Sequence, residues 1–207
     1  MEKHMIITIG REYGSGGREV GETIARKLGI KCYDKEILAA SAKNSGFAAK
    51  VFEEYDETAK NSLLYSLAVN TGFSYPFGEK PVAVQLYLEQ FHTIKELAKK
   101  EPCVFIGRCS DYVLRNYENV VNVFAHAPIE QRIERICRRS QVDREKAGAM
   151  IAKVDKTRAG YYHYYTDQKW GRANNYNLCL DTGKLGIRGA VEMIEKYIEC
   201  TIDMGSL

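Results

Sequence analysis

A dense group of glycines near the N-terminus has the residue types and spacing that point most directly to chemistry. Gly10, Gly14, Gly16 and Gly17 fall within eight positions, directly after the apolar run 5–9. The segment after them has apolar residues four apart, which predicts a helix. These residues are Val20, Ile24 and Leu28. A strand, a glycine loop and a helix N-terminus together present backbone N–H groups and partial positive charge to a phosphate. A tight turn that needs glycine only for positive φ is the alternative, and the density of glycines favours phosphate binding.

The loop departs from the Walker pattern GxxxxGK[ST] at three positions. Arg11 stands where the first glycine would be, Gly17 where the lysine would be, and Arg18 where the serine or threonine would be. The loop therefore lacks the lysine that meets the β- and γ-phosphates and the hydroxyl that ligates magnesium. Arg11 and Arg18 can supply positive charge, but a guanidinium cannot ligate a metal.

Composition narrows the classes of protein that need to be considered. A chain of 207 residues fits a single domain with a sizeable core. The formal net charge of +3 gives no argument for a nucleic-acid or membrane partner, and no apolar run approaches the roughly 20 residues that span a bilayer. The chain enters its first strand without a signal-peptide pattern. Its six cysteines include no CxxC pair, so we expect reduced thiols in a cytoplasmic protein.

The rest of the chain alternates between apolar runs and helical patterns. We predict strands at 5–9, 30–34, 103–107, 120–127 and 177–183, and helices at 17–28, 83–100, 129–139 and 187–202, with a helical stretch over 143–170. This alternation predicts an α/β fold with a parallel sheet covered by helices on both faces. Ligands bind such sheets at the carboxyl ends of the strands. The residues expected there are Gly10, Asp34, Arg108 and Asp181.

Six segments, in order, resemble the cytidylate kinase-like branch of the P-loop nucleoside monophosphate kinases. They are ITIGREYGSGGREVGETIARKLGI, IKCYDKEIL, VFIGRCSDYVL, VFAHAPIEQRIERICRR, DKTRAGYYHYY and NLCLDTGKLG. The resemblance covers nearly the whole chain and implies a P-loop NTPase-type fold as one domain, 1–207. It also implies an acceptor-binding helical insertion, 35–100, and a lid region, 140–175.

The resemblance implies a site for ATP with Mg²⁺ around the glycine loop. The loop amides would hold the β-phosphate, and Arg18 is the candidate substitute for the missing lysine. The residues assigned to the cofactor are Gly10, Arg11, Gly14, Ser15, Gly16, Gly17, Arg18, Asp181 and Thr182. We predict no metal site made by protein ligands alone.

The resemblance also implies a site for the phosphoryl acceptor. Arg108 would bind the monophosphate, and Asp34 would position the acceptor or hold magnesium through water. Asp155 and Arg158, three residues apart on one helix face, would read the base and contact phosphate. Arg132 would approach the phosphates from the lid side. The catalytic candidates are therefore Arg18, Asp34 and Arg132.

Each of these assignments has a structural alternative. Asp34 could cap the next helix, and Arg108 could pair with Asp111 on the surface. Asp155 and Arg158 could form an ordinary ion pair on a solvated helix. The arginines of 129–139 could be a solvated face. A fifth alternative concerns the tyrosine-rich end of 143–170, which could stack on a base or pack against a neighbouring helix or a second subunit.

Three functions fit these observations. The first is transfer of the ATP γ-phosphoryl group to a nucleoside monophosphate, with CMP or dCMP as acceptor. The second is a non-catalytic nucleotide-binding or regulatory protein on the same scaffold, suggested by Gly17 and Arg18 at the Walker lysine and hydroxyl positions. The third is a kinase for another small acceptor. We expect a small-molecule nucleotide partner, no nucleic acid, no membrane, and room for a homodimer.

Overall fold

A parallel sheet of five strands organises the computed structural model, which describes residues 4–34 and 82–201. The spatial order is β2-β3-β1-β4-β5, and every neighbouring pair is parallel. The strands are β1 (Ile6–Arg11), β2 (Lys31–Tyr33), β3 (Cys103–Ile106), β4 (Val120–His126) and β5 (Leu178–Asp181). The predicted α/β fold class is therefore confirmed. The acceptor-binding insertion predicted at 35–100 falls mostly outside the described residues, which resume at 82.

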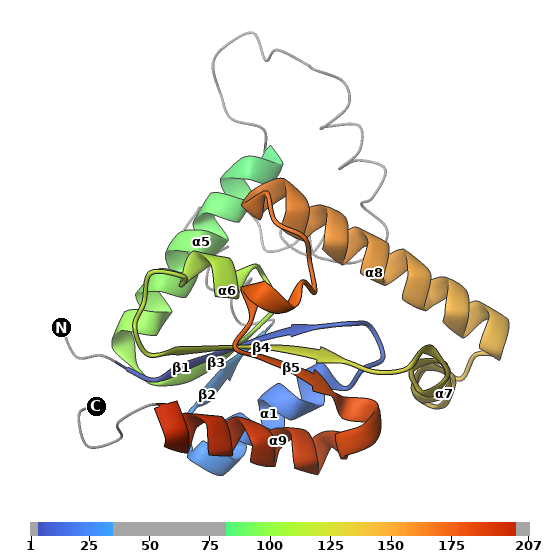
Figure 1. Cartoon of the computed structure of the whole chain (residues 1–207). Coiled ribbons are helices and arrows are strands. Elements are labelled where there is room, and N and C mark those ends of the chain that lie inside the picture. The colour runs from blue at the N-terminus through green and yellow to red at the C-terminus, as the bar shows by residue number, and fades with distance from the viewer. Residues whose placement is uncertain (1–3, 35–81, 202–207) are drawn as a thin grey trace, which may run out of the picture.

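Helices lie on both faces of this sheet (Figure 1). They are α1 (Gly17–Leu28), α5 (Val82–Lys100), α6 (Ser110–Val113), α7 (Ile129–Ser140), α8 (Arg144–Thr166) and α9 (Thr182–Thr201), with a short 3₁₀ turn, η2 (Ala173–Asn175). In Figure 1, α1 and α9 lie side by side below the sheet, whereas α5, α6 and α8 lie above it.

The strand β1 is mostly apolar up to Ile9 because both faces of the sheet are covered, and its one polar side chain there, Thr8, donates to Asn122 Oδ1 at 2.6 Å. Ile7 and Ile9 join Ile24 of α1 in one buried cluster, whereas Ile6 joins Phe105 in another cluster on the opposite face. Successive side chains of a strand point to opposite faces, so a strand buried on both sides needs a continuous apolar run. This packing fixes the carboxyl end of β1, where the glycine loop begins.

The helix α1 follows the loop as the sequence predicts. It begins after Gly16, which has a φ of 85°, and ends at Gly29, which has a φ of 68°. Val20 and Ile24, four residues apart, are fully buried against the sheet. The glycines at both ends supply the left-handed backbone that non-glycine residues adopt at a cost.

Two elements end at least two residues before the end that the sequence predicts. The strand expected at 177–183 ends at Asp181, because Thr182 already begins α9, which is kinked at Gly186. The helical stretch expected to reach 170 ends at Thr166. Asp167 stops it by taking a left-handed conformation and donating its N–H to the His163 carbonyl.

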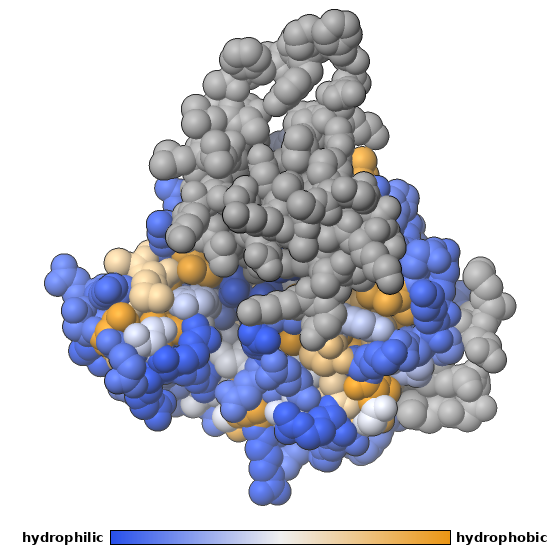
Figure 2. All heavy atoms as spheres, turned by 180° about the vertical axis from the view of Figure 1, so that it is seen from behind, coloured by the Kyte–Doolittle hydropathy of each residue, from blue (hydrophilic) through white to orange (hydrophobic). Residues whose placement is uncertain are grey.

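Figure 2 shows the molecule from behind, with hydrophobic residues scattered among mostly hydrophilic ones outside the grey segment. Among residues 4–34 and 82–201, no helix combines the length and the hydropathy needed to cross a membrane.

Candidate active site

A broad cleft of about 1230 Å³ opens at the carboxyl edge of the sheet. Three glycines of the loop line it, together with seven arginines and four carboxylates. The arginines are Arg11, Arg18, Arg108, Arg135, Arg138, Arg139 and Arg158. The carboxylates are Glu12, Glu19, Glu22 and Asp34. This excess of guanidinium groups suits a ligand that carries several negative charges, because arginine binds phosphate oxygens with paired donors.

The glycine loop is a compact turn held by its own hydrogen bonds. The Ser15 amide and hydroxyl both donate to the Glu12 carbonyl, at 3.2 and 2.9 Å. The Gly17 amide donates in turn to the Ser15 hydroxyl at 3.3 Å. Gly14 and Gly16 have φ values of 83° and 85°, a region that glycine enters without strain. These hydrogen bonds and the two glycine conformations therefore determine the shape of the loop.

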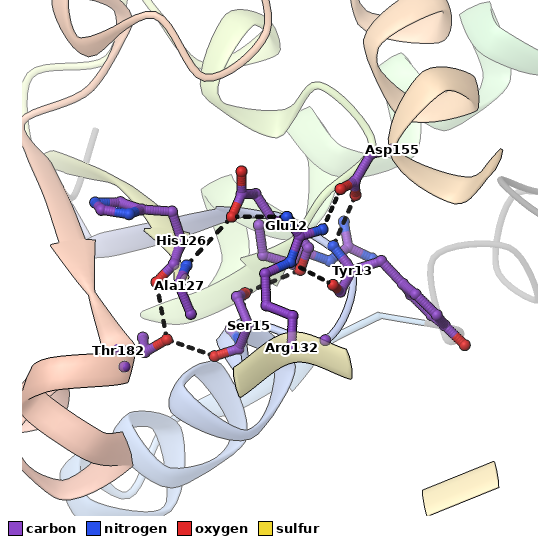
Figure 3. Close-up of polar contacts among 12 residues, drawn as sticks. Glu12, Tyr13, Ser15, His126, Ala127, Arg132, Asp155 and Thr182 are labelled. Atoms are coloured by element: carbon purple, nitrogen blue, oxygen red, sulfur yellow. Dashed lines mark hydrogen bonds and ion pairs between the residues drawn. The ribbon is translucent and has the colours of Figure 1, made fainter. Parts of the chain in front are cut away.

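Arg132, from α7, packs against the side of this loop that faces α7 and α8, which we call the underside of the loop (Figure 3). Its Nε donates to the Tyr13 carbonyl at 2.8 Å. Its two terminal nitrogens pair with Glu12 at 3.2 Å and with Asp155 of α8. The Arg132 side chain is 7% exposed, so its charge is almost fully removed from water. The two carboxylates neutralise this charge, which a buried guanidinium requires.

The two carboxylates also bind backbone amides. Asp155 accepts from the Tyr13 amide at 2.8 Å, and Glu12 accepts from the Ala127 amide at 3.2 Å. The loop is thereby tied to α7, to α8 and to the segment between β4 and α7. Tyr13 packs between the two helices against Ile136 and its neighbours, and the Arg139 guanidinium lies 5.0 Å from its ring centroid.

The far side of the loop is fixed by the start of α9. The buried Thr182 hydroxyl lies 2.5 Å from the Ser15 carbonyl and 2.9 Å from the His126 carbonyl (Figure 3). Asp181 caps α9 by accepting from the amides of Gly183 and Lys184, at 2.9 and 3.3 Å. Asp181 also lines a second hollow of about 500 Å³, between β4, β5 and the segment after α8.

Arg108 stands on a left-handed turn after β3. Gly107, Arg108 and Cys109 have φ values of 76°, 60° and 53°, and the Ser110 amide donates to the Gly107 carbonyl at 3.1 Å. Non-glycine residues with positive φ carry strain that the surrounding fold must offset, and such residues gather at functional sites. Arg108 is 5% exposed. The alternative of a surface ion pair with Asp111 is therefore wrong, because both residues are buried.

A smaller pocket adjoins the cleft behind Arg108. Arg11, Arg108 and Arg158 line both the pocket and the cleft, so these three arginines stand where the two meet. Arg158 of α8 donates to the Arg11 carbonyl at 3.0 Å. Both oxygens of Asp155 are engaged by Tyr13 and Arg132. The two residues predicted as a pair on one helix face therefore bind different partners.

The inner wall of this pocket contains a buried carboxylate. Asp111 accepts a hydrogen bond of 2.6 Å from the Tyr162 hydroxyl. Burial raises the pKa of Asp111 above its ordinary value, and the Tyr162 hydrogen bond partly opposes this shift. Burial, together with Asp111, also raises the pKa of the Tyr162 phenol, which keeps that group protonated.

Comparison with known proteins identifies the family. Residues 6–184 match the model of the cytidylate kinase-like family. The chain belongs to that family.

Two curated relatives span nearly the whole chain. A cytidylate kinase from Archaeoglobus fulgidus is 27% identical over 200 residues, which covers 94% of this chain and 95% of the relative. A cytidylate kinase from Methanocaldococcus jannaschii is 23% identical over 199 residues, covering 94% and 98%. These identities are low.

Solved structures support the fold. An uncharacterized protein from Eubacterium ventriosum has a TM-score of 0.71 and 30% identity, covering 95% of this chain and 99% of that chain. A shikimate kinase from Bacteroides thetaiotaomicron has a TM-score of 0.55 at 14% identity, covering 94% and 98%. At that identity the likeness concerns the fold alone, which is that of P-loop kinases.

The structure brings eight of the residues selected from the sequence to the cleft of this cytidylate kinase-like protein. They are Arg11, Gly14, Gly16, Gly17, Arg18, Asp34, Arg108 and Arg158. Gly10 lines the adjoining pocket. The others support the loop or lie beside it. They are Ser15, Arg132, Asp155, Asp181 and Thr182. Whether any of them contacts a ligand remains a prediction.

Arg18 and Arg132 have surroundings that differ from those expected. Arg18 pairs with Glu22 at 2.9 Å and with Asp34 at 3.3 Å, and its side chain is 53% exposed. The ion pair with Glu22 is exposed, and it holds the Arg18 guanidinium that would otherwise have to bind phosphate as the substitute lysine. Arg132 is engaged with the underside of the loop and is not among the residues that line the cleft.

Sequence reasoning missed two residues around the loop. Glu12 joins Arg132 to the Ala127 amide, and Arg135 donates to the Gly14 carbonyl at 3.1 Å. Arg135 was visible in the sequence as one of several arginines on the same helix. No local pattern separates it from its neighbours, because the contacts that do so come from more than 100 residues away.

The tyrosine-rich end of α8 packs against α5, which is the neighbouring-helix alternative among the three expected. Tyr165 stacks on Tyr87 with 3.8 Å between ring centroids, and Tyr161 meets the edge of the same ring. Trp170 instead meets Phe124 of β4 edge-to-face, at 5.3 Å.

The described residues offer no ready-made metal cage. Within 4–34 and 82–201, no group of three or more His, Cys, Asp or Glu residues could hold a metal ion. All six cysteines lie in this part of the chain and are free thiols. The carboxylates that line the cleft are those of Glu12, Glu19, Glu22 and Asp34.

Proposed function

We propose that this protein transfers the γ-phosphoryl group of ATP to a nucleoside monophosphate, with CMP or dCMP as the acceptor. The observation that carries this proposal is the junction of Arg11, Arg108 and Arg158, which line both the glycine-loop cleft and the adjoining pocket. Membership of the cytidylate kinase-like family and two relatives named cytidylate kinase support it.

The larger cleft is the proposed donor site. The glycine loop and the N-terminus of α1 would hold the phosphates of ATP through backbone amides. Arg135 and Arg139, at the other wall of the cleft, would meet them from the lid side. The lid, 140–175, contains α8, which Asp155 ties to the loop, so closure over ATP would act on the loop directly.

The part of the cleft that borders the smaller pocket is the proposed acceptor site, because the pocket itself, at about 20 Å³, has room for little more than one water. Arg108 would grip the monophosphate, and its strained backbone would fix the direction of the guanidinium. Asp34, at the end of β2, would position the acceptor from the other side of the cleft. The segment 35–81, expected to complete this site, lies outside the described residues.

In the reaction, an oxygen of the acceptor phosphate forms a bond to the γ-phosphorus while the bond to the β–γ bridging oxygen breaks. ADP then leaves with that oxygen. Such a transfer needs alignment and positive charge more than covalent participation by the protein. Arginines at the junction supply charge to both partners. Mg²⁺, when bound to the nucleotide, would screen the β- and γ-phosphates, and the carboxylates of the cleft have the oxygen ligands it prefers.

One feature favours a second candidate, a nucleotide-binding protein without kinase activity. Gly17 and Arg18 stand at the Walker lysine and hydroxyl positions. A protein of this kind would bind ATP in the same cleft but would not turn it over. A kinase with another small acceptor is the third candidate, because the described residues leave the acceptor side incomplete.

A turnover assay separates these candidates. Purified protein is incubated with ATP, Mg²⁺ and each of a panel of nucleoside monophosphates and small polyols, and ADP formation is followed. ADP that forms only with CMP or dCMP is the expected result. Arg108→Ala is the site variant, and Arg115→Ala, an exposed arginine on the segment after α6, is its matched control. ATP binding by calorimetry without turnover would support the second candidate, and no ATP binding at all would contradict the proposal.

A further inference from the structure

The position of the missing Walker lysine is already filled by another residue. A Cβ atom at Gly17 would lie 2.5 Å from the Arg11 Cβ and 3.2 Å from the Arg11 Cγ. It would also lie 2.9 Å from the Ala125 Cβ. Carbon atoms that are not bonded pack at roughly 3.5–4.0 Å, so no side chain fits at position 17 unless these neighbours shift. Glycine at this position is a requirement of packing in this chain.

The sheet explains why Arg11 reaches this place. Arg11 is the last residue of β1, the central strand, and it pairs in register with Ala125 of β4. The side chains of both residues therefore extend from neighbouring strands toward the first turn of α1, where Gly17 lies between them. An arginine at the end of the strand and a glycine at the start of the helix form one complementary pair.

Arg18 stands in a different environment. Its side chain is 53% exposed and lies between Glu22, at 2.9 Å, and Asp34, at 3.3 Å. Both carboxylates offset its charge. Arg11 is partly buried and lines the cleft as well as the adjoining pocket. Of the two arginines that flank the loop, Arg11 is the one whose side chain would contact a Cβ atom at position 17, from which a Walker lysine would extend.

We infer that Arg11 supplies, from the end of β1, the phosphate-binding cation that a Walker lysine supplies from the start of the helix. The inference rests on the proposed function, because it assigns Arg11 to the ATP phosphates within the proposed donor site. A guanidinium at the junction of cleft and pocket is always charged and can donate two hydrogen bonds to one phosphate. It can therefore bind the donor phosphates at the point where they meet the acceptor.

The first test measures binding of inorganic tripolyphosphate and of ATP by calorimetry. Arg11→Gln keeps a polar side chain and removes the charge, and we expect the affinity for both ligands to fall about tenfold to hundredfold. Arg18→Gln should cause a smaller loss. Arg26→Gln, an exposed arginine in the last turn of the same helix, is the matched control for net charge and should change affinity by less than about threefold. A larger loss from Arg18→Gln than from Arg11→Gln would overturn the inference.

The second test measures the packing without any ligand. Gly17→Ala should lower the melting temperature, because the added methyl group meets the Arg11 and Ala125 side chains. Arg11→Gly removes the nearest of these atoms, so the double variant Arg11→Gly/Gly17→Ala should lose less than the sum of the two single variants. Such non-additivity is the measure of direct contact. Strictly additive losses would show that the two positions do not exclude one another.

The third test exchanges the position of the charge. Arg11→Gly/Gly17→Lys moves the cation from the strand to the helix, and it should recover part of the tripolyphosphate affinity that Arg11→Gly alone loses. No recovery in a folded double variant would overturn the exchange of roles.

The proposed function and the inference about Arg11 can fail separately. A wild-type protein that binds neither ATP nor tripolyphosphate contradicts the proposed function and this inference together, whereas wild-type binding that Arg11→Gln leaves unchanged contradicts this inference alone.

Discussion

The underside of the glycine loop and its cleft face both use arginine, but in opposite ways. Beneath the loop, Arg132 is buried and is matched by two carboxylates, Glu12 and Asp155. On the cleft face, seven arginines face four carboxylates, and one of these four is Glu12, which already pairs with Arg132. A matched and buried charge fixes a structure, whereas an excess of positive charge around an open cleft suits a ligand that brings the missing negative charge. The difference separates residues that shape the loop from residues that would bind.

Arg132→Ala should have the largest effect of the variants considered. It would leave Glu12 and Asp155 close together without their shared partner. Removal of one member of a buried ion pair costs about 3–5 kcal/mol, and the partial exposure of both carboxylates places the expected loss near the lower end. Urea unfolding followed by circular dichroism measures it.

Arg138→Ala is the control on the same helix. Arg138 is exposed and lines the cleft, so its removal should change the free energy of unfolding by less than about 0.5 kcal/mol. Equal losses of stability for the two variants would show that the underside and the cleft face do not differ in the way described.

Arg108→Ala should have the next largest effect, on acceptor use and not on the fold of the loop. Loss of a charge-assisted hydrogen bond to phosphate corresponds to roughly 1.5–3 kcal/mol, so kcat/KM for the monophosphate should fall about tenfold to hundredfold. Initial rates at varied CMP and at varied ATP measure it. An equal fall for ATP at saturating CMP would place Arg108 with the donor instead.

Much of the fold was predictable from the sequence because the central strands are buried on both faces. The β3 run is apolar throughout, and the β1 run is apolar up to Ile9 except for Thr8, so both favour a strand that is buried on both faces. The first helix was equally clear from its apolar spacing and its flanking glycines. Boundaries were less certain where one residue ends a strand and the next begins a helix, as at Asp181 and Thr182.

The division of roles among the arginines was not predictable. Arg132 and Arg135 are three residues apart on α7, and their spacing does not show that one lies beneath the loop and the other lines its cleft face. The partners that decide this, Glu12 and Gly14, are more than 100 residues away in the chain. A motif can indicate which residues gather at one edge of a sheet, but long-range ion pairs and hydrogen bonds decide which of them line the cleft.

Asp111→Asn tests a buried carboxylate on the pocket side, which accepts a hydrogen bond from the Tyr162 hydroxyl. The pKa of Asp111 in the folded protein is raised by burial, so the folded state holds its proton more tightly than the unfolded state does. Stability from this group is present at low pH and is lost as pH rises from the ordinary value of 3.8 through the raised pKa.

The asparagine variant removes that titration while its amide oxygen can still accept the hydrogen bond of Tyr162. The slope of unfolding free energy against pH should therefore become shallower by up to about 1.4 kcal/mol per pH unit in this window. Thermal unfolding at a series of pH values measures it. Parallel curves for the two proteins would show that Asp111 is not the titrating group.

Arg18→Ala should have the smallest effect on stability, and it tests whether burial or the number of flanking carboxylates makes an arginine important for the fold. Arg18 belongs to the cleft face, yet two carboxylates flank it, as two carboxylates flank Arg132 beneath the loop. The difference is exposure. An exposed pair four residues apart on a helix contributes about 0.3–0.5 kcal/mol, and the positive helix N-terminus offsets part of that gain by repelling a cation.

We therefore expect the free energy of unfolding of Arg18→Ala to stay within about 0.5 kcal/mol of wild type, measured by urea unfolding at low and high salt. A loss as large as that of Arg132→Ala would show that flanking carboxylates matter more than burial. The affinity for ATP, measured on the same variant, separates the two arginines next to the loop. A tenfold to hundredfold loss is what a substitute lysine at position 18 requires, whereas a smaller loss fits a phosphate-binding cation at Arg11.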